Sequence, residues 1–167
     1  PYPSYNGGED FPDEASWAAY VQRGGKLSRG DWRRQAVNAF IHDVYRTIKQ
    51  ERAHVKFGLS PFGIWRPGYP PPIRGLDAYD QLYADSRTWL TQGWLDYLAP
   101  QLYWPIDAPA QSFPALLDWW AAQNHRQRHL WPGISITGTE GNRPPREILN
   151  QGRLTRAQTG ASGHILW

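Results

Sequence analysis

The sequence of 167 residues contains no cysteine and no methionine. Without cysteine the chain has no disulfides, no thiol nucleophiles and no cysteine-ligated metal centres. It also lacks a run of about 18 apolar residues, which a membrane-spanning helix needs. With 40% hydrophobic and 20% charged residues, the composition is typical of a soluble, folded chain rather than a disordered one. We therefore expect no membrane span.

The chain carries no positively charged and apolar leader of the signal-peptide type, and it opens on Pro1. Its length corresponds to one domain or to part of one. We expect a piece of a longer protein.

The sequence has no strong excess of charge of either sign. Lysine and arginine total 18 against 15 aspartates and glutamates, so the formal net charge is only +3. The basic residues are scattered and form no stripe interleaved with aromatic residues, which is the pattern of a nucleic-acid groove. We expect no nucleic-acid partner.

The order of predicted elements alternates between helices and strands. Residues 1–30 are rich in proline, glycine and acids, which predicts a long loop with at most a helical turn around residues 14–20. Apolar residues at helical spacing predict a helix of about five turns that begins at Asp31. Three helix–strand pairs follow an initial strand at residues 55–59: helices over residues 77–89, 112–124 and 147–157, and strands over residues 97–104, 130–136 and 163–167.

This alternation predicts βα units and a parallel sheet, so the fold class is α/β. Buried parallel strands are apolar on both faces, as residues 98–102 and 130–136 are. An open doubly wound sheet and a barrel give the same pattern, and periodicity leaves both open.

Three stretches carry more specific information: VKFGLSPFGIW at residues 55–65, LYADSR at residues 82–87 and DYLAPQLYW at residues 96–104. With DWRR at residues 31–34 and LLDWW at residues 116–120, they resemble the glycosyl-hydrolase-like family 10. Members of this family are (β/α)8 barrels and include bacterial envelope enzymes that cleave peptidoglycan glycan strands stripped of their peptides. The resemblance implies that residues 1–167 are the C-terminal half of a (β/α)8 TIM barrel, with about strands five to eight. The chain is then a single partial domain, with a catalytic-face loop at residues 1–30 and βα units at residues 31–167.

The resemblance also implies that the catalytic residues lie upstream of Pro1. In the family, a strand ending in paired aspartates precedes a Tyr-Pro-Tyr-Pro-like segment, and residues 1–3 match the end of that segment. Glycoside hydrolysis usually needs two carboxyl groups, one as acid and one as base or nucleophile. Within this chain, Glu9 and Asp10 lie in a glycine-rich polar stretch, where we expect solvated, ionised carboxylates. Asp107 and Glu140 are the other candidate acids; both follow strand ends, where a carboxylate could bind sugar hydroxyls.

Aromatic residues are the stronger signal for a site, because sugar rings pack their flat C–H faces on Trp and Tyr. The sequence contains ten Trp residues, and those at helical spacing, such as Trp119 and Trp120, are predicted to be core. Sites of parallel barrels form where strands end. The residues predicted there to bind substrate are Tyr2, Trp65, Arg66, Gln101, Tyr103, Trp104, Asp107 and Trp167.

Six of these residues have a structural alternative. Trp65, Arg66, Gln101, Tyr103 and Trp104 would otherwise pack the mouth of the barrel, and Asp107 would cap a loop. Gln101 lies inside an apolar strand, where its amide must find hydrogen-bond partners. Tyr2 is included on the resemblance alone.

We expect no metal and no cofactor. The five histidines do not form a ligand set, and His125 with His129 precedes a strand at the end of the sheet opposite to the predicted site. No phosphate-binding glycine loop and no nucleophile elbow is present.

These observations predict a glycoside hydrolase domain acting on a bacterial glycan, with peptidoglycan glycan strands as the substrate that the resemblance implies. This chain would supply part of the cleft and be inactive alone; the alternative is a non-catalytic glycan-binding or scaffold fragment. Because a half barrel leaves open strand edges, we expect it to bind its missing N-terminal half or a second copy. The resemblance places the protein in the bacterial cell envelope or outside the cell.

Overall fold

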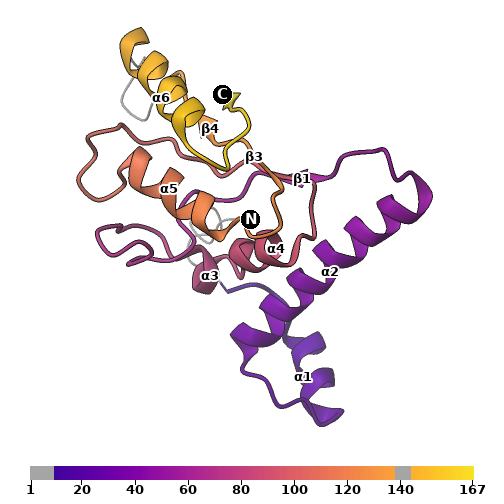
Figure 1. Ribbon diagram of the computed structural model, residues 1–167. Helices are drawn as coiled ribbons and strands as arrows, with labels where there is room; N and C mark the ends of the chain where they lie inside the picture. The colour runs from indigo at the N-terminus through magenta and orange to yellow at the C-terminus, as the bar shows by residue number, and fades with distance from the viewer. Residues whose placement is uncertain (1–9, 138–143) are drawn as a thin grey trace.

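The computed structural model describes residues 10–137 and 144–167 (Figure 1). Its elements, in chain order, are α1 (Glu14–Gln22), α2 (Arg29–Glu51), β1 (Gly58–Leu59), α3 (Ala78–Gln81), α4 (Ser86–Gln92), β2 (Tyr97–Leu98), α5 (Phe113–Gln123), β3 (His129–Leu130), β4 (Gly133–Ile134), α6 (Pro145–Ala157) and β5 (Ile165–Leu166). In the described part of the chain, no helix is both long and apolar enough to cross a membrane.

The strands pair in parallel and in chain order. β1 pairs with β2, and β2 pairs with β3, in one sheet, while β4 pairs with β5 in another. Isolated parallel bridges from Gln101 to Phe62 and to Gly133 continue the pairing between these two sheets. The parallel pairing predicted from the alternation of strands and helices is therefore confirmed.

Regular strands are much shorter than the sequence predicted, with two residues each. Pro61, Pro100 and Pro132 interrupt the ladder because proline has no backbone N–H to donate. Pairing resumes beyond these prolines, where the N–H of Gln101 donates to the carbonyl of Pro61 at 3.0 Å. The predicted strand at residues 130–136 thus becomes β3 and β4.

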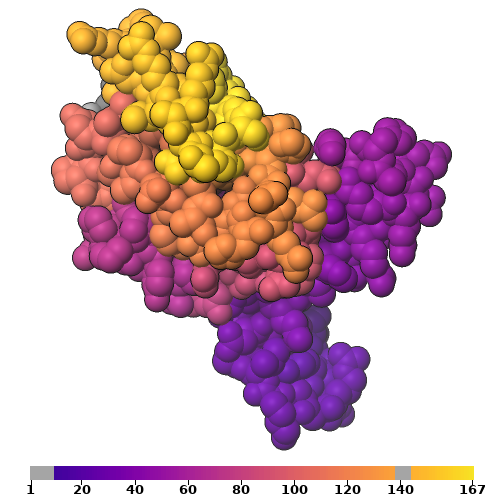
Figure 2. All heavy atoms as spheres, in the orientation of Figure 1, coloured from indigo at the N-terminus to yellow at the C-terminus, as the bar shows by residue number. Residues whose placement is uncertain are grey.

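The prediction of a loop over the first thirty residues is wrong for α1, which is a nine-residue helix. Its ring contacts explain its stability, because an isolated helix of this length is marginal in water. Trp17 and Tyr20 of α1 pack on Trp32 of α2, with ring centroids 5.4 and 5.9 Å apart. Because these contacts join two helices, the local composition of residues 14–22 does not predict that α1 is stable. Figure 2 shows α1 and the start of α2 projecting from the rest of the molecule.

The helix predicted over residues 77–89 is two helices, α3 and α4. Two aspartates start them separately: the carboxylate of Asp77 accepts from the N–H of Asp80 at 3.0 Å, and that of Asp85 accepts from Thr88 at 3.3 Å. Between the helices, Tyr83 has a φ of 54°, which breaks helical geometry. At the end of α4, Gly93 adopts the left-handed conformation, which is common for a glycine that ends a helix.

The core lies between one face of the sheet and helices α4 and α5. Leu98 and Leu130 are fully buried, as are the core side chains of α5, Leu116 and Trp120. Side chains alternate between the faces of a strand, and the residue preceding each of these leucines is half-buried or exposed. The described helices therefore cover one face of the sheet, and the other face is left partly open.

That second face carries an aromatic stack. Tyr97 stacks on Trp131 with a centroid separation of 4.7 Å, and His129 stacks on Trp131 at 5.2 Å. A side chain at Gly58 would collide with the ring of Tyr97, at 2.3 Å. The small residue in β1 therefore lets Tyr97 lie across the sheet.

Candidate functional site

Parallel strands bring their C-terminal ends to one side of a sheet. Here these ends carry Phe62, Gln101, Tyr103, Trp104 and Trp167, and we call this group the carboxyl edge. Of the eight residues predicted to bind substrate, the structure places Gln101, Tyr103, Trp104 and Trp167 along it.

Gln101 lies at the centre of the carboxyl edge. Its backbone bridges Phe62 on one side and Gly133 on the other. Its side-chain amide donates to the carbonyl of Ser60 at 3.0 Å, so the half-buried amide finds the hydrogen-bond partner that the sequence required.

Two aromatic rings converge over Gly133. A Cβ atom at this glycine would lie 3.1 Å from Cε1 of Tyr103 and 3.1 Å from Nε1 of Trp167. Trp167 is 54% exposed, and Tyr103 is half-buried. The edge thus presents an aromatic surface whose shape depends on the absence of a side chain at Gly133.

Trp104 extends the carboxyl edge toward the segment that follows β2. Its half-buried ring meets Phe62 edge to face, with centroids 5.6 Å apart and an interplanar angle of 85°. Asp107, three residues further on, is exposed to solvent. Flat rings beside hydrogen-bonding groups are what a sugar ring with its hydroxyls requires.

Trp65 is placed in the core instead. It is 8% exposed, stacks on Trp119 at 5.9 Å, and donates its indole N–H to Asp85 at 3.1 Å. This burial favours packing, the alternative to sugar contact at this position. Its neighbour Arg66 is ion-paired with Asp77 at 3.1 Å and with Asp80 at 2.6 Å.

Tyr2, Glu9 and Glu140 lie outside the described residues, so the structure does not place them. Asp10 is described, and it is ion-paired with Arg33 at 2.8 Å. The hydrogen bond from Arg33 is the main reason why the pKa of Asp10 is lowered. Asp10 therefore stays ionised and is unsuited to act as a general acid.

Asp13 is held ionised by the same guanidinium. Arg33 is 8% exposed and donates to the carboxylate of Asp13 at 2.7 Å. Hydrogen bonds from Arg33 and then Arg29, against the opposing effect of burial, keep the pKa of Asp13 well below its ordinary value. Arg33 also donates to the hydroxyl of Tyr83 at 2.5 Å, so this cluster ties the segment before α1 to α2 and to the turn before α4.

Sequence reasoning missed two polar residues of α6. Glu147 accepts a hydrogen bond from the backbone N–H of Ile106 at 2.8 Å, and Gln151 donates to the carbonyl of Trp104 at 2.9 Å. Gln151 is fully buried. Gln151 lies one turn after Glu147 and Ile148, on the buried side of the helix. A polar residue at such a position is the feature of the sequence that could have identified these contacts.

No metal-binding cluster is present in the described part of the chain: no group of three or more histidines, aspartates or glutamates there is arranged to hold an ion. His129, one of the two histidines considered in the sequence, stacks on Trp131, and its Nδ1 lies 3.3 Å from the hydroxyl of Ser162.

The described part of the chain is thus a mixed helix and strand protein with small parallel sheets, in which aromatic residues and Gln101 lie at the C-terminal ends of the strands. Comparison with known proteins identifies its family. Residues 1–140 match the family model described as Glycosyl hydrolase-like 10, and the chain belongs to this family. The resemblance noticed in the sequence is confirmed at the level of the family.

Two curated relatives illustrate the match. The chain is 38% identical to "Glycosyl hydrolase YngK" of Bacillus subtilis (strain 168) in an alignment of 166 residues that covers 93% of this chain. It is 45% identical to "Glycosyl hydrolase DigH" of Escherichia coli (strain K12) in an alignment of 141 residues that covers 80% of this chain. In both comparisons the match covers 32% of the relative. The chain thus spans about a third of the length of the curated relatives it matches.

Proposed function

We propose that this chain is part of a glycoside hydrolase domain and forms one wall of its glycan cleft, with peptidoglycan glycan strands as the substrate. Family membership supports the class of reaction. The observation that carries the proposal is the convergence of Tyr103 and Trp167 over Gly133, a residue that pairs through its backbone with Gln101. Aromatic surface next to planar hydrogen-bonding groups is suited to a carbohydrate.

We propose further that the chain contains four consecutive strands of a (β/α)8 barrel, about the fifth to the eighth. They correspond to β1, to β2, to β3 together with β4, and to β5. A doubly wound sheet reverses its strand order at the switch point, whereas the described segments keep chain order throughout. The partly open face with Tyr97 and Trp131 would then point into the barrel. The missing half would cover that face and pair with the outer edges of β1 and β5.

The catalytic carboxylates are proposed to lie outside this chain, upstream of Pro1. Hydrogen bonds from Arg33 are the main reason why the pKa values of Asp10 and Asp13 are lowered. The pKa of Asp96 is also lowered because, against the effect of burial, its carboxylate accepts from Lys49 and from the N–H of Phe57. These three acids are unsuited to act as a protonated general acid, and the chain alone is proposed to be inactive.

The same observation favours a second candidate, a non-catalytic glycan-binding or scaffold role for the chain. An assay on peptide-free peptidoglycan glycan strands, with this chain and with the full-length protein that contains it, separates the two. The enzyme proposal expects cleavage by the full-length protein and none by the chain. Binding without cleavage by the full-length protein would contradict it and support the second candidate.

The proposed substrate sets the partner and the location. The partner is a glycan, together with the missing N-terminal half of the barrel or a second copy of the chain. A protein that acts on peptidoglycan works in the bacterial cell envelope or after secretion. Fractionation of the producing cells tests this, since a strictly cytoplasmic protein would argue against the substrate.

A further inference from the structure

The first two turns of α6 contact the segment that follows β2 at two points. The carboxylate of Glu147 accepts from the backbone N–H of Ile106 at 2.8 Å. The amide of Gln151 donates to the carbonyl of Trp104 at 2.9 Å and to the same Glu147 oxygen at 2.9 Å. Residues four apart on a helix lie on one face, so these two side chains hold the backbone on both sides of Pro105.

These contacts are shielded from water. Gln151 is fully buried, and the carbonyl of the same residue accepts from the hydroxyl of Thr155, itself 1% exposed, at 2.9 Å. The amide nitrogen of Gln151 has two acceptors, whereas its buried oxygen has no hydrogen-bond partner in the described part of the chain. The carbonyl of Trp104 and the N–H of Ile106 are thus joined to α6 by hydrogen bonds that are lost if the segment moves.

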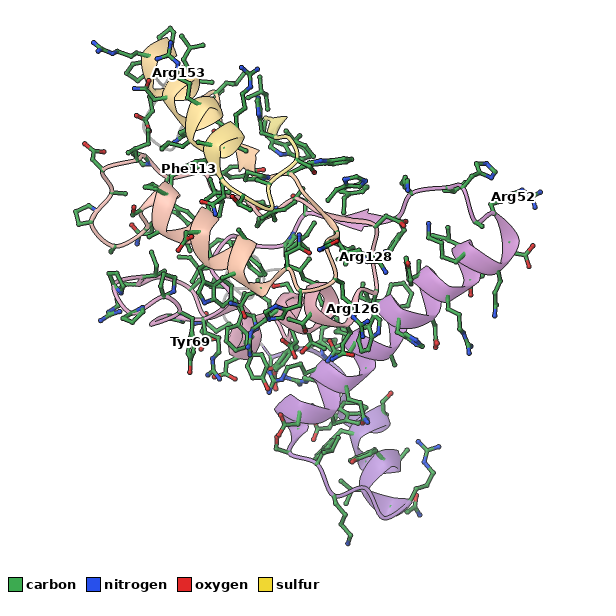
Figure 3. All side chains as sticks on the ribbon, in the orientation of Figure 1. Arg52, Tyr69, Phe113, Arg126, Arg128 and Arg153 are labelled. Atoms are coloured by element: carbon green, nitrogen blue, oxygen red, sulfur yellow. The ribbon has the colours of Figure 1, made fainter. Side chains whose placement is uncertain are left out.

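The segment between β2 and α5 also makes hydrogen bonds within itself, close to the start of α5. The hydroxyl of Ser112 and the N–H of Phe113 donate to the carbonyls of Ile106 and Pro105, both at 3.3 Å. Figure 3 shows α6, marked by Arg153, next to the start of α5, marked by Phe113. The backbone at Trp104–Asp107 thus has fixed points on both sides, while the Trp104 ring packs on Phe62.

We infer that Glu147 and Gln151 are positioning residues, which hold Trp104 of the carboxyl edge and the exposed Asp107 in place for the glycan. The inference rests on the proposed function. Neither residue needs to touch the sugar, because each acts through the backbone that carries Trp104 and Asp107.

Two substitutions at position 147 separate hydrogen bonding from charge. Glu147→Gln keeps an oxygen that can accept from both the Ile106 N–H and the Gln151 amide, whereas Glu147→Leu removes the acceptor. Arg146→Ala is the matched control, because Arg146 is an exposed residue of the same helical turn. Gln151→Met keeps the shape of the buried side chain but removes both donated hydrogen bonds, and it replaces E147L in the test where that variant does not fold.

The experiment is a calorimetric titration of the full-length protein with a peptide-free glycan oligosaccharide. We expect E147L to raise the Kd about tenfold, which corresponds to ~1.4 kcal/mol. E147Q and R146A should bind as the wild type does. In a Trp104→Ala, Asp107→Ala background, E147L should cause no further loss, because the groups that it positions are already gone. Hydrogen exchange at the Ile106 amide should be faster in E147L than in R146A.

Each result decides between alternatives. Wild-type affinity in E147L despite faster exchange at Ile106 would overturn the inference and leave the proposed function standing. So would a loss of affinity that is as large in the background without Trp104 and Asp107, because Glu147 would then act by general stabilisation. No glycan binding by the wild-type protein would overturn the proposed function and the inference together.

Discussion

At the scale of single residues, Gly133 is the position on which the carboxyl edge depends most. A methyl group there would lie 3.1 Å from both Tyr103 and Trp167, which is closer than ordinary contact. We predict that Gly133→Ala displaces the two rings and weakens glycan binding by about tenfold, a typical effect of one misplaced methyl group in a binding pocket. Titration of the variant with a peptide-free glycan oligosaccharide measures this.

Gly163→Ala is the matched control for that substitution. Its methyl group would meet Trp131 at 3.2 Å, an equally tight contact with an indole ring away from the carboxyl edge. It should lower stability and leave glycan affinity unchanged. Equal losses of affinity in G133A and G163A would mean that binding follows stability rather than the geometry over Gly133.

Asp13 gives a prediction for the dependence of stability on pH. Its pKa in the folded state is below the ordinary value, mainly because Arg33 donates to it. Its stabilisation is therefore complete above the unfolded pKa of about 3.9 and is lost as the pH falls toward the folded pKa. Asp13→Asn should lower the free energy of unfolding by about 1–3 kcal/mol at neutral pH, and this difference should shrink below about pH 4.

Urea unfolding of the wild type and D13N between neutral and acidic pH measures the difference. Glu14→Gln is the control, since the Glu14 side chain is 79% exposed although it pairs with Arg29 at 2.6 Å. Exposed ion pairs contribute little, so E14Q should resemble the wild type throughout. A D13N difference that stays constant as the pH falls would rule out the proposed role of the carboxylate charge.

At the scale of elements, the contact between the segments that follow β1 and β2 allows a direct test. A Cβ atom at Gly63 would lie 2.2 Å from the backbone carbonyl oxygen of Gln101, which cannot move without breaking the bridge to Phe62. Gly63→Ala should therefore destabilise the fold by about 1–3 kcal/mol, the usual range for overpacking. Denaturant unfolding measures it.

Gly152→Ala is the control for that test. Gly152 lies within α6, and its added methyl group would meet only ordinary contact, 3.7 Å from His164. Alanine in a helix is favoured over glycine by about 1 kcal/mol, so G152A should be neutral or stabilising. Unchanged stability in G63A would show that the strand ends separate more easily than the structure implies.

Among the elements, those with a local signal could be predicted and those that depend on distant contacts could not. α2 and α5 were predicted because apolar spacing and a favourable first turn occur together. The break between α3 and α4 depends on Tyr83, whose hydroxyl accepts from Arg33, fifty residues earlier in the chain. Strand length was overestimated because hydrophobicity continues through prolines that interrupt regular pairing.

For the candidate site, too, the sequence predicts which residues lie at the strand ends but not how they are arranged in space. Strand ends in the sequence are sufficient to select Gln101, Tyr103, Trp104 and Trp167. The convergence of two of these rings over Gly133 depends on the register of neighbouring strands, which no local pattern contains. Trp65 has the same local signal, but stacking on Trp119 of α5 buries it.

At the scale of the whole molecule, the proposed half barrel would leave strand edges uncovered. Within the described residues, β5 pairs with β4 alone, and Leu166 in this edge strand is 53% exposed beside Trp167. Exposed apolar edge strands associate with other strands. We predict that the isolated chain self-associates, and light scattering should give a mass above the 19.2 kDa of one copy.

Leu166→Lys places a charge on that edge and should shift the chain toward the monomer. A stable monomer of the wild-type chain would contradict the half-barrel proposal. A dimer that L166K leaves unchanged would place the contact elsewhere.

If the carboxyl edge of this chain forms a wall of the glycan cleft, its indole rings contact the bound glycan, and nuclear magnetic resonance of the ten Trp indole N–H groups of the chain detects that contact. Single Trp→Phe substitutions assign the signals, and a peptide-free glycan oligosaccharide is then titrated into the full-length protein. We expect the signals of Trp104 and Trp167 to shift with the glycan, while those of Trp89, which is buried in the core, and Trp94, which precedes β2, stay in place. Shifts at Trp89 and Trp94 with none at the carboxyl edge would contradict the proposal.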